Sequence, residues 1–152
     1  MARVKISLPG QFSFSCNIPV RITDVNYGGH VGNDTILSII HEARIQFLNS
    51  IGYTEMMFAG VGLIMADVMI EFKKEIFYGD TVKVSMAAEE SSKVAIDIFY
   101  KLEKPDNKNS NGKNLLVAVA KTGMVCFDYN MKKIAGIPEE ARAKLSGLNG
   151  IK

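Results

Sequence analysis

The chain has 152 residues, 47% of them hydrophobic and 22% charged, and a formal net charge of +2. This length and composition indicate a single globular domain, residues 1–152, with a core of useful size. The small charge, with no basic stripe carrying interleaved aromatic residues, argues against nucleic acid as a partner. No apolar run approaches about 18 residues and the start lacks a signal-peptide core, so we expect a cytoplasmic protein without a membrane segment.

The first regular segment is a half-buried strand. Apolar and polar residues alternate strictly from Phe12 to Ile22, which is the period of a strand with one buried face. Pro19 belongs to the polar set and has no backbone N–H to donate, so it predicts a strand at the edge of a sheet or a position whose N–H is not needed.

A long core helix follows and is the most apolar periodic segment of the chain. At about 100° per residue, about half of its circumference is apolar. Asn33 or Asp34 is the expected N-cap, and Gly52 is the expected C-cap. Arg44 falls inside the apolar arc, where a buried charge needs a carboxylate or carbonyl partner. His41, at the edge of that arc, is expected to be a hydrogen-bonded histidine beside the core.

Four more strands and a short helix complete the pattern. Alternation or continuous apolar character predicts the strands at residues 63–72, 82–86, 94–102 and 115–127. The polar segment from Lys104 to Asn114 is an expected mobile hairpin loop. Pro138 opens the last helix, and Gly147 is expected just after its end.

Short turns between consecutive strands predict antiparallel pairing. We therefore expect an α+β fold in which a five-stranded antiparallel sheet wraps around one long central helix. The second and fifth strands are apolar on both faces, which predicts extra burial by a partner subunit. Four methionines around the second strand either pack in the core or line an adaptable apolar pocket; they are Met56, Met57, Met65 and Met69.

The two cysteines and two histidines suggest no metal or redox chemistry. Cys16 and Cys126 lie in apolar strand patterns, so we expect two buried thiols rather than a disulfide or a nucleophile. The spacing of the four residues matches no metal site, and no phosphate-loop or dinucleotide fingerprint is present. The sequence therefore predicts no cofactor.

A glycine-rich loop joins the first strand to the core helix. Three glycines, Gly28, Gly29 and Gly32, fall within seven residues, which indicates positive φ angles or the close approach of a ligand to the backbone. The helix N-terminus that follows offers free N–H donors and a positive dipole end. An oxygen that gains negative charge during a reaction would be stabilised there.

Four motifs occur in order along the chain: Asp24-Val25-Asn26, Gly29-His30-Val31-Gly32-Asn33, Glu42-Ala43-Arg44, and Gly79-Asp80 with Val82. With this spacing the chain resembles the hot-dog fold, in particular the 4-hydroxybenzoyl-CoA thioesterase-like family of acyl-CoA thioesterases. The resemblance implies hydrolysis of an acyl-CoA or acyl-carrier thioester by a homodimer or homotetramer with the acyl site between subunits. It also implies an acidic nucleophile or base in the loop, and backbone N–H groups that polarise the carbonyl.

The family's carboxylate position is occupied by Asn26. A neutral amide cannot act as a carboxylate base or nucleophile, although it can orient water or hold a carbonyl. The candidate catalytic residues are therefore Asn26, Asp24, His30, Glu42 and Asp67. The expected substrate-binding residues are Tyr27, Gly28, Gly29, Gly32, Asn33 and Asp34, with Lys73, Lys74 or Arg21 near the phosphates of coenzyme A.

Each candidate also has a structural interpretation. Asp24 caps the loop or pairs with an arginine, and Glu42 lies on a solvated stripe. Asp67 is exposed, His30 makes a hydrogen bond within the loop, and Tyr27 packs rather than lines the acyl pocket.

Asn26 leaves a second function open, namely binding of acyl thioesters or fatty acids without cleavage. A dehydratase is a third hypothesis, but the loop pattern does not fit that branch, and the helix holds no suitable pairing of histidine with an acid.

Overall fold

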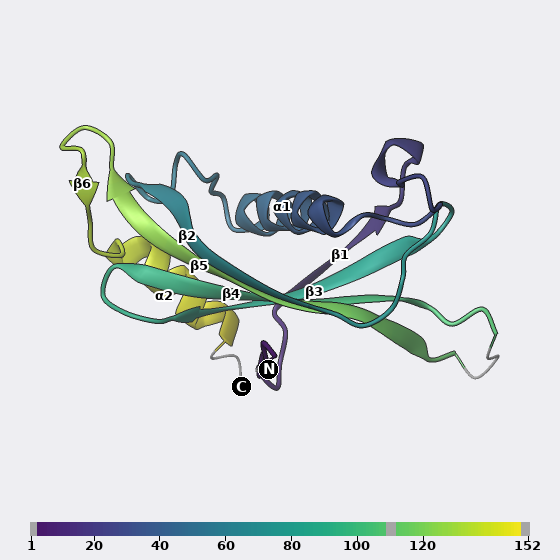
Figure 1. The fold of residues 1–152 in the computed structure, drawn as a ribbon. Coiled ribbons are helices and arrows are strands. Elements are labelled where there is room, and N and C mark those ends of the chain that lie inside the picture. The colour runs from purple at the N-terminus through teal and green to yellow at the C-terminus, as the bar shows by residue number, and fades with distance from the viewer. Residues whose placement is uncertain (1–2, 109–111, 150–152) are drawn as a thin grey trace.

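A curled antiparallel sheet with a long helix on its concave side makes up the fold (Figure 1). The computed structural model describes residues 3–108 and 112–149. The strands are β1 (Phe14–Pro19), β2 (Gly62–Phe72), β3 (Thr81–Glu90), β4 (Ala95–Pro105), β5 (Asn114–Asp128) and β6 (Lys133–Ile134). The helices are η1 (Ile22–Asp24), α1 (Asn33–Ser50) and α2 (Glu139–Asn149).

The strands run in the order β1-β3-β4-β5-β2, and β6 pairs with the end of β5. Every pairing is antiparallel, so the expected five-stranded sheet around a central helix is confirmed. The short strand β6 was not predicted. Figure 1 places α2 on the side of the sheet opposite to α1. Among the described residues, no helix is long and apolar enough to cross a membrane.

The first strand ends earlier than its alternation predicts. β1 lies at the edge of the sheet, as expected from Pro19, which is its last residue. The chain then turns into η1, where the Asp24 carboxylate accepts the backbone N–H of Arg21 at 2.8 Å. This local capping competes with strand pairing, so the predicted extension to Ile22 is wrong.

The C-terminal helix also differs from its prediction. The carbonyl of Pro138 accepts the N–H of Arg142 at 2.9 Å, and the helix starts one residue after the proline. Gly147 lies inside the helix rather than after it, and its φ is not positive. The expected mobile hairpin loop is shorter than predicted because β4 reaches Pro105; its central residues, 109–111, lie outside the described residues.

The face of α1 that packs on the sheet is apolar except for one charge. Its buried residues are Ile36, Ile39, Ile40, Ala43, Arg44, Phe47 and Leu48. After the C-cap Ile51, Gly52 takes a φ of +86°, and the N–H of Tyr53 donates to the carbonyl of Leu48 at 2.8 Å. The C-cap is therefore Ile51 rather than the predicted Gly52, and the positive φ of Gly52 turns the chain away one position later.

A polar network ties α1 to the sheet through the buried Arg44. Its Nε donates to Glu55 Oε2 at 2.6 Å, and a second nitrogen donates to the Tyr100 hydroxyl at 3.2 Å. Tyr100 in turn contacts the Thr122 hydroxyl at 2.7 Å, and His41 Nε2 lies 3.0 Å from the other oxygen of Glu55. The expected carboxylate partner of Arg44 is therefore Glu55, on the connection that follows α1.

The charge of Glu55 is favoured in the folded chain. Burial raises the pKa of Glu55, but the hydrogen bond and charge of Arg44, with a smaller contribution from His41, lower it below its ordinary value. A group with a lowered folded-state pKa contributes stability that is present above its unfolded pKa, about 4.3, and lost as the pH falls through its folded pKa.

We predict that Glu55→Gln lowers the free energy of unfolding by about 3 kcal/mol at pH 7, since it leaves the Arg44 charge buried without its carboxylate. The variant should also lose less further stability than the parent chain between pH 5 and pH 3. Denaturant unfolding followed by circular dichroism at several pH values measures both effects. Equal acid sensitivity in the two proteins would show that Glu55 does not carry this part of the stability.

Candidate active site

The glycine loop before α1 is a closed turn built around Asn26. The Asn26 N–H donates to the carbonyl of His30 at 2.9 Å, and the Asn26 carbonyl accepts the N–H of Gly29 at 3.0 Å. The side-chain oxygen Oδ1 accepts the N–H of Gly28 at 2.9 Å. Gly29 has a φ of +83°, as the glycine density predicts. These bonds occupy the amide oxygen of Asn26 and leave its Nδ2 as the group that can meet a ligand.

His30 connects this loop to the segment that follows β2. Its Nδ1 lies 3.3 Å from the carbonyl of Val31, and its Nε2 lies 3.6 Å from a carboxylate oxygen of Glu75. The ring also packs edge-on against Phe77, and the N–H of Val31 donates to the carbonyl of Ile76 at 2.7 Å. The expected hydrogen bond of His30 within the loop is present, and the same ring faces a carboxylate.

The N-cap of α1 is Gly32, so the prediction of Asn33 or Asp34 at this position is wrong. The carbonyl of Gly32 accepts the N–H groups of Thr35 and Ile36 at 3.0 and 3.3 Å, and no side chain caps the helix. Asn33 and Asp34 therefore begin the helix itself. Their N–H groups point out of the first turn, where the helix dipole is positive and favours negative charge.

Gly32 also lies between two side chains of the candidate site. A Cβ at this position would lie 2.7 Å from Asp34 Oδ1 and 3.9 Å from Asn26 Nδ2. The side chain of Asp34 thus folds back toward Gly32, which the amide of Asn26 also approaches. The absence of a side chain at this glycine leaves room for that arrangement.

A cleft of about 230 Å³ opens beside this helix N-terminus. It is lined by His30, Val31, Asn33, Ile36, Phe72, Lys73, Lys74, Glu75, Ile76 and Val117. Lys74 and Glu75 also line a neighbouring cleft that extends toward Lys104. An acyl thioester at Asn33 would therefore find apolar walls and two lysines within the same depression.

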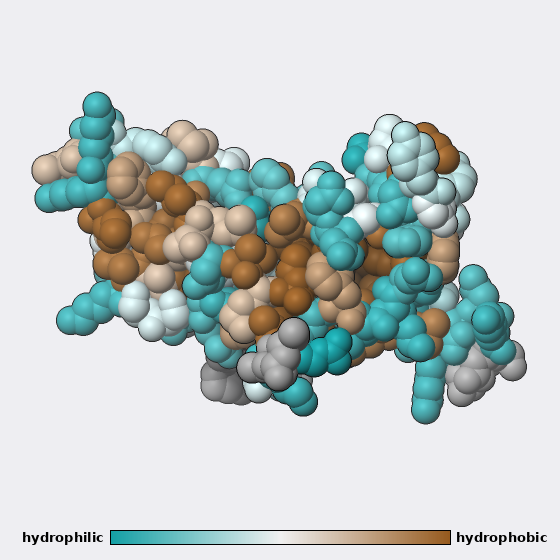
Figure 2. All heavy atoms as spheres, in the orientation of Figure 1, coloured by the Kyte–Doolittle hydropathy of each residue, from teal (hydrophilic) through white to brown (hydrophobic). Residues whose placement is uncertain are grey.

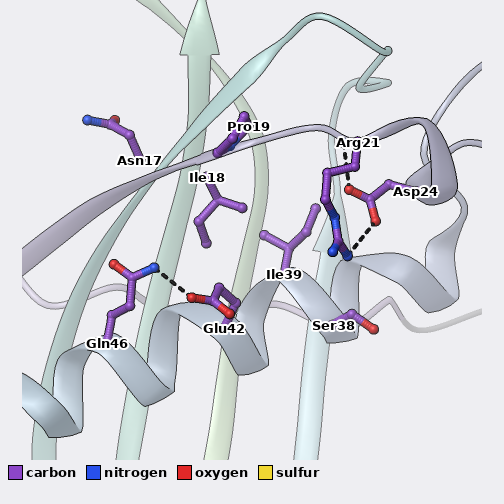
Figure 3. Close-up of a pocket in the computed structure, with 9 residues that line it drawn as sticks. All are labelled: Asn17, Ile18, Pro19, Arg21, Asp24, Ser38, Ile39, Glu42 and Gln46. Carbon is purple, nitrogen blue, oxygen red and sulfur yellow. Dashed lines mark hydrogen bonds and ion pairs between the residues drawn. The ribbon is translucent and has the colours of Figure 1, made fainter.

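Asp24 and Glu42 line a different cleft, of about 260 Å³, between β1 and α1 (Figure 3). Figure 3 shows the Arg21–Asp24 pair at one end and Glu42 with Gln46 at the other. The buried Asp24 accepts both the N–H and the guanidinium of Arg21, the latter at 3.3 Å, while Glu42 accepts the Gln46 amide at 2.8 Å. The structural pairing expected for Asp24 is confirmed, with Arg21 as the partner.

Asp67 lies on β2, next to an irregularity in its pairing with β5. Its carboxylate accepts Lys121 Nζ at 2.9 Å and the N–H of Gly123 at 3.0 Å. The hydrogen bond from Lys121 is the main reason that the pKa of Asp67 lies below its ordinary value. Five residues separate Asp67 from Phe72 at the cleft, about 17 Å along a strand, so this chain does not bring Asp67 to the loop.

Tyr27 lies at the tip of the loop, fully exposed, and does not pack in the single chain. Of the eleven sequence candidates, the loop and helix start bring together Asn26, Tyr27, Gly28, Gly29, His30, Gly32, Asn33 and Asp34.

Sequence reasoning missed Phe72, Glu75 and Val117 of the cleft, since no local motif marks them. Among the described residues, no three His, Cys, Asp or Glu side chains cluster as metal ligands.

The two thiols are free and weakly acidic. Cys126 is buried, and burial raises its pKa to about 11; Cys16 is half-buried, and burial together with the charge of Glu42 raises its pKa. Neither thiol has the environment of a nucleophile, which needs a lowered pKa.

Comparison with known proteins identifies relatives across most of the chain. A profile of the thioesterase-like superfamily matches residues 20–145. A protein of Aquifex aeolicus (strain VF5) named "Putative esterase" is 28% identical over 123 residues, which are 80% of this chain and 88% of that protein.

Solved structures show the same fold. A 1,4-dihydroxy-2-naphthoyl-CoA thioesterase from Synechocystis superposes with a TM-score of 0.75 at 22% identity, covering 90% of this chain and 97% of that one. A thioesterase from Thermus thermophilus, complexed with coenzyme A and Zn, has a TM-score of 0.76 at 22% identity, covering 95% and 100%. These similarities confirm the predicted hot-dog fold.

We predict that neither cysteine of the folded protein reacts with a disulfide reagent at pH 8 at the rate of free cysteine. A pKa of about 11 in place of 9.0 lowers the thiolate population of Cys126 about 100-fold. Absorbance during reaction with the reagent, before and after addition of guanidinium chloride, should show two thiols only on unfolding. A fast thiol in the native protein would contradict the raised pKa of both thiols.

Proposed function

The chain belongs to the thioesterase-like superfamily, and from this premise we propose that it hydrolyses an acyl-CoA or acyl-carrier thioester at the N-terminus of α1. The observation that carries the proposal is the glycine-capped helix start, whose free N–H groups border a cleft lined by His30 and Asn33. Water adds to the thioester carbonyl carbon, the carbon–sulfur bond breaks, and the thiol leaves. The negative charge that develops on the carbonyl oxygen is stabilised by the N–H groups and the dipole of α1.

The cleft suits a thioester with a phosphate-bearing thiol. The relative from Thermus thermophilus is complexed with coenzyme A, which supports coenzyme A as the thiol here. Lys73 and Lys74 lie on the cleft wall next to the helix start, where they would meet phosphates. The Lys73 ammonium is paired with Glu71 at 3.2 Å, so Lys74 is the better candidate of the two.

The second candidate function is binding of acyl thioesters without cleavage. It is favoured by Asn26, whose amide stands where the family resemblance places a carboxylate and whose oxygen is already engaged by Gly28. Such a protein would bind acyl-CoA saturably and release no thiol.

The assembly proposed for this activity is at least a homodimer, formed through β2. This edge strand has 11 residues and, within the described part of the chain, pairs along one edge only, with β5. Figure 2 shows hydrophobic side chains gathered where β2 passes below α1. Exposed apolar residues in this region include Leu37, Met56, Met57, Ile64, Met65 and Phe72. A long, exposed apolar edge strand favours pairing with another strand. We therefore propose that β2 of a second copy of this chain covers it.

The methionines have a place in this assembly. Met56, Met57 and Met65 are 68%, 64% and 41% exposed, so core packing is wrong for these three in the single chain. A partner subunit or an acyl group would cover them. The opposite edge strand, β1, has only six residues and ends in Pro19. It therefore has fewer backbone groups with which a second copy could pair.

Release of thiol from acyl-CoAs of short, long and aromatic acyl type, measured with a colour reagent, tests the proposed function. We expect turnover by the parent chain and a loss of about 100-fold in Asn26→Ala, since one donor near the oxyanion is removed. If the parent chain releases no thiol from any acyl-CoA of the panel but binds acyl-CoA saturably in calorimetry, the binding function would be supported instead. Hydrolysis gained only in Asn26→Asp would point the same way.

We predict that Met65→Lys converts the dimer to monomer at micromolar concentration, because each copy would bring a charge into the proposed apolar β2 interface. Light scattering coupled to size exclusion gives the mass. The control is Met131→Lys, at an exposed methionine on the β5–β6 connection, which should remain dimeric. A dimer that survives Met65→Lys would place the interface elsewhere.

A further inference from the structure

The proposed hydrolysis needs a proton acceptor, and Asn26 does not provide one. The amide nitrogen has no basicity, and the amide oxygen already accepts the N–H of Gly28 at 2.9 Å. What Asn26 presents toward Gly32 is its Nδ2, which is a donor. The site therefore contains a donor where the family resemblance places a base, and the acceptor has to come from another residue.

Asp34 is a carboxylate that approaches the same glycine as this donor. Its Oδ1 and the Nδ2 of Asn26 lie 2.7 Å and 3.9 Å from one shared point, the Cβ position of Gly32. Within residues 3–108 and 112–149, no hydrogen bond or ion pair engages the Asp34 side chain. The other carboxylates near the loop have partners: Asp24 is bound by Arg21, and Glu75 faces His30.

We infer that Asp34 is the general base of the reaction, and that Asn26 holds the attacking water or the carbonyl oxygen by donating from Nδ2; this inference rests on the proposed hydrolysis. The Asp34 carboxylate takes one proton from water as the water oxygen bonds to the carbonyl carbon. The carbonyl π electrons move to oxygen, beside the N–H groups of the helix start. They return as the carbon–sulfur bond breaks, and Asp34 passes its proton to the departing sulfur, so that water and thioester give acid and thiol.

A purely structural role for Asp34 makes different predictions. A carboxylate in the first turn of a helix interacts favourably with the helix dipole, whatever it does in catalysis. Glu139 lies in the first turn of α2, outside the site, where it also pairs with Arg142. Loss of a first-turn charge can therefore be compared at two helices, only one of which borders the cleft.

The deciding experiment measures kcat, KM and thermal midpoint for the parent chain, Asp34→Asn and the control Glu139→Gln. We expect kcat to fall at least 100-fold in Asp34→Asn, the usual minimum for loss of a general base, with KM changed less than about threefold. The double variant Asn26→Asp/Asp34→Asn should regain at least tenfold, because it restores one carboxylate beside Gly32. Glu139→Gln should keep its kcat while its midpoint falls, since this variant loses both the dipole interaction and the pairing with Arg142.

Gly32→Ala tests the position of the carboxylate without removing it. The φ of Gly32 is −71°, which alanine adopts freely, but the new methyl group would lie 2.7 Å from Oδ1 and push the Asp34 side chain away. We expect kcat to fall at least tenfold in a folded protein.

Asp34→Asn that keeps more than a third of the parent kcat would overturn this inference, and so would full activity in Gly32→Ala. In either case hydrolysis by the parent chain would leave the proposed function intact. A parent chain that hydrolyses no acyl-CoA would overturn both.

Discussion

One buried guanidinium sets the position of α1 on the sheet. Arg44 shares the apolar stripe of Ile40, Phe47 and Leu48, so the helix cannot pack on the sheet without burying this charge. An unpaired charge there would cost several kcal/mol, and Glu55 and Tyr100 supply the hydrogen bonds that offset it. Because these partners stand on a connection and on β4, the rotation of α1 about its own axis is fixed. The direction of its free N-terminus, and hence the geometry of the cleft, follows from that.

The sequence allowed the elements to be predicted well where periodicity is long, and poorly where an end depends on one contact. Alternation located five strands and the apolar arc located α1, because burial of one face dictates those periods. The predicted ends of these elements were wrong where a local contact decided them. Asp24 folds back on Arg21 and ends β1 early, Gly147 adopts helical backbone inside α2, and the two residues of β6 pair with β5 with no pattern of their own.

Some residues of the candidate site could be predicted from a local motif, and others could not. Residues from Asn26 to Asp34 are neighbours in the chain, so a motif finds them together. Asp24 and Glu42 share a cleft on the β1 side of α1, and Asp67 is bound to Lys121 on the sheet, so the five catalytic candidates do not form one group. Phe72 and Val117 reach the cleft through the register of β2 with β5, in which Phe72 lies opposite Ala118. Strand register depends on the whole sheet, and no local motif encodes it.

The asparagine at position 26 is consistent with a carboxylate at position 34. An aspartate in both places would set two negative groups around the α-carbon of Gly32, where their repulsion would oppose ionisation of both. An amide at position 26 removes that repulsion and adds a donor whose orientation the Gly28 N–H fixes. The pair then offers one donor and one acceptor to the same water molecule, which is the arrangement that directs a lone pair of the water oxygen toward a carbonyl carbon. The departure from the family pattern at Asn26 is thus compatible with hydrolysis when Asp34 is counted as part of the same site.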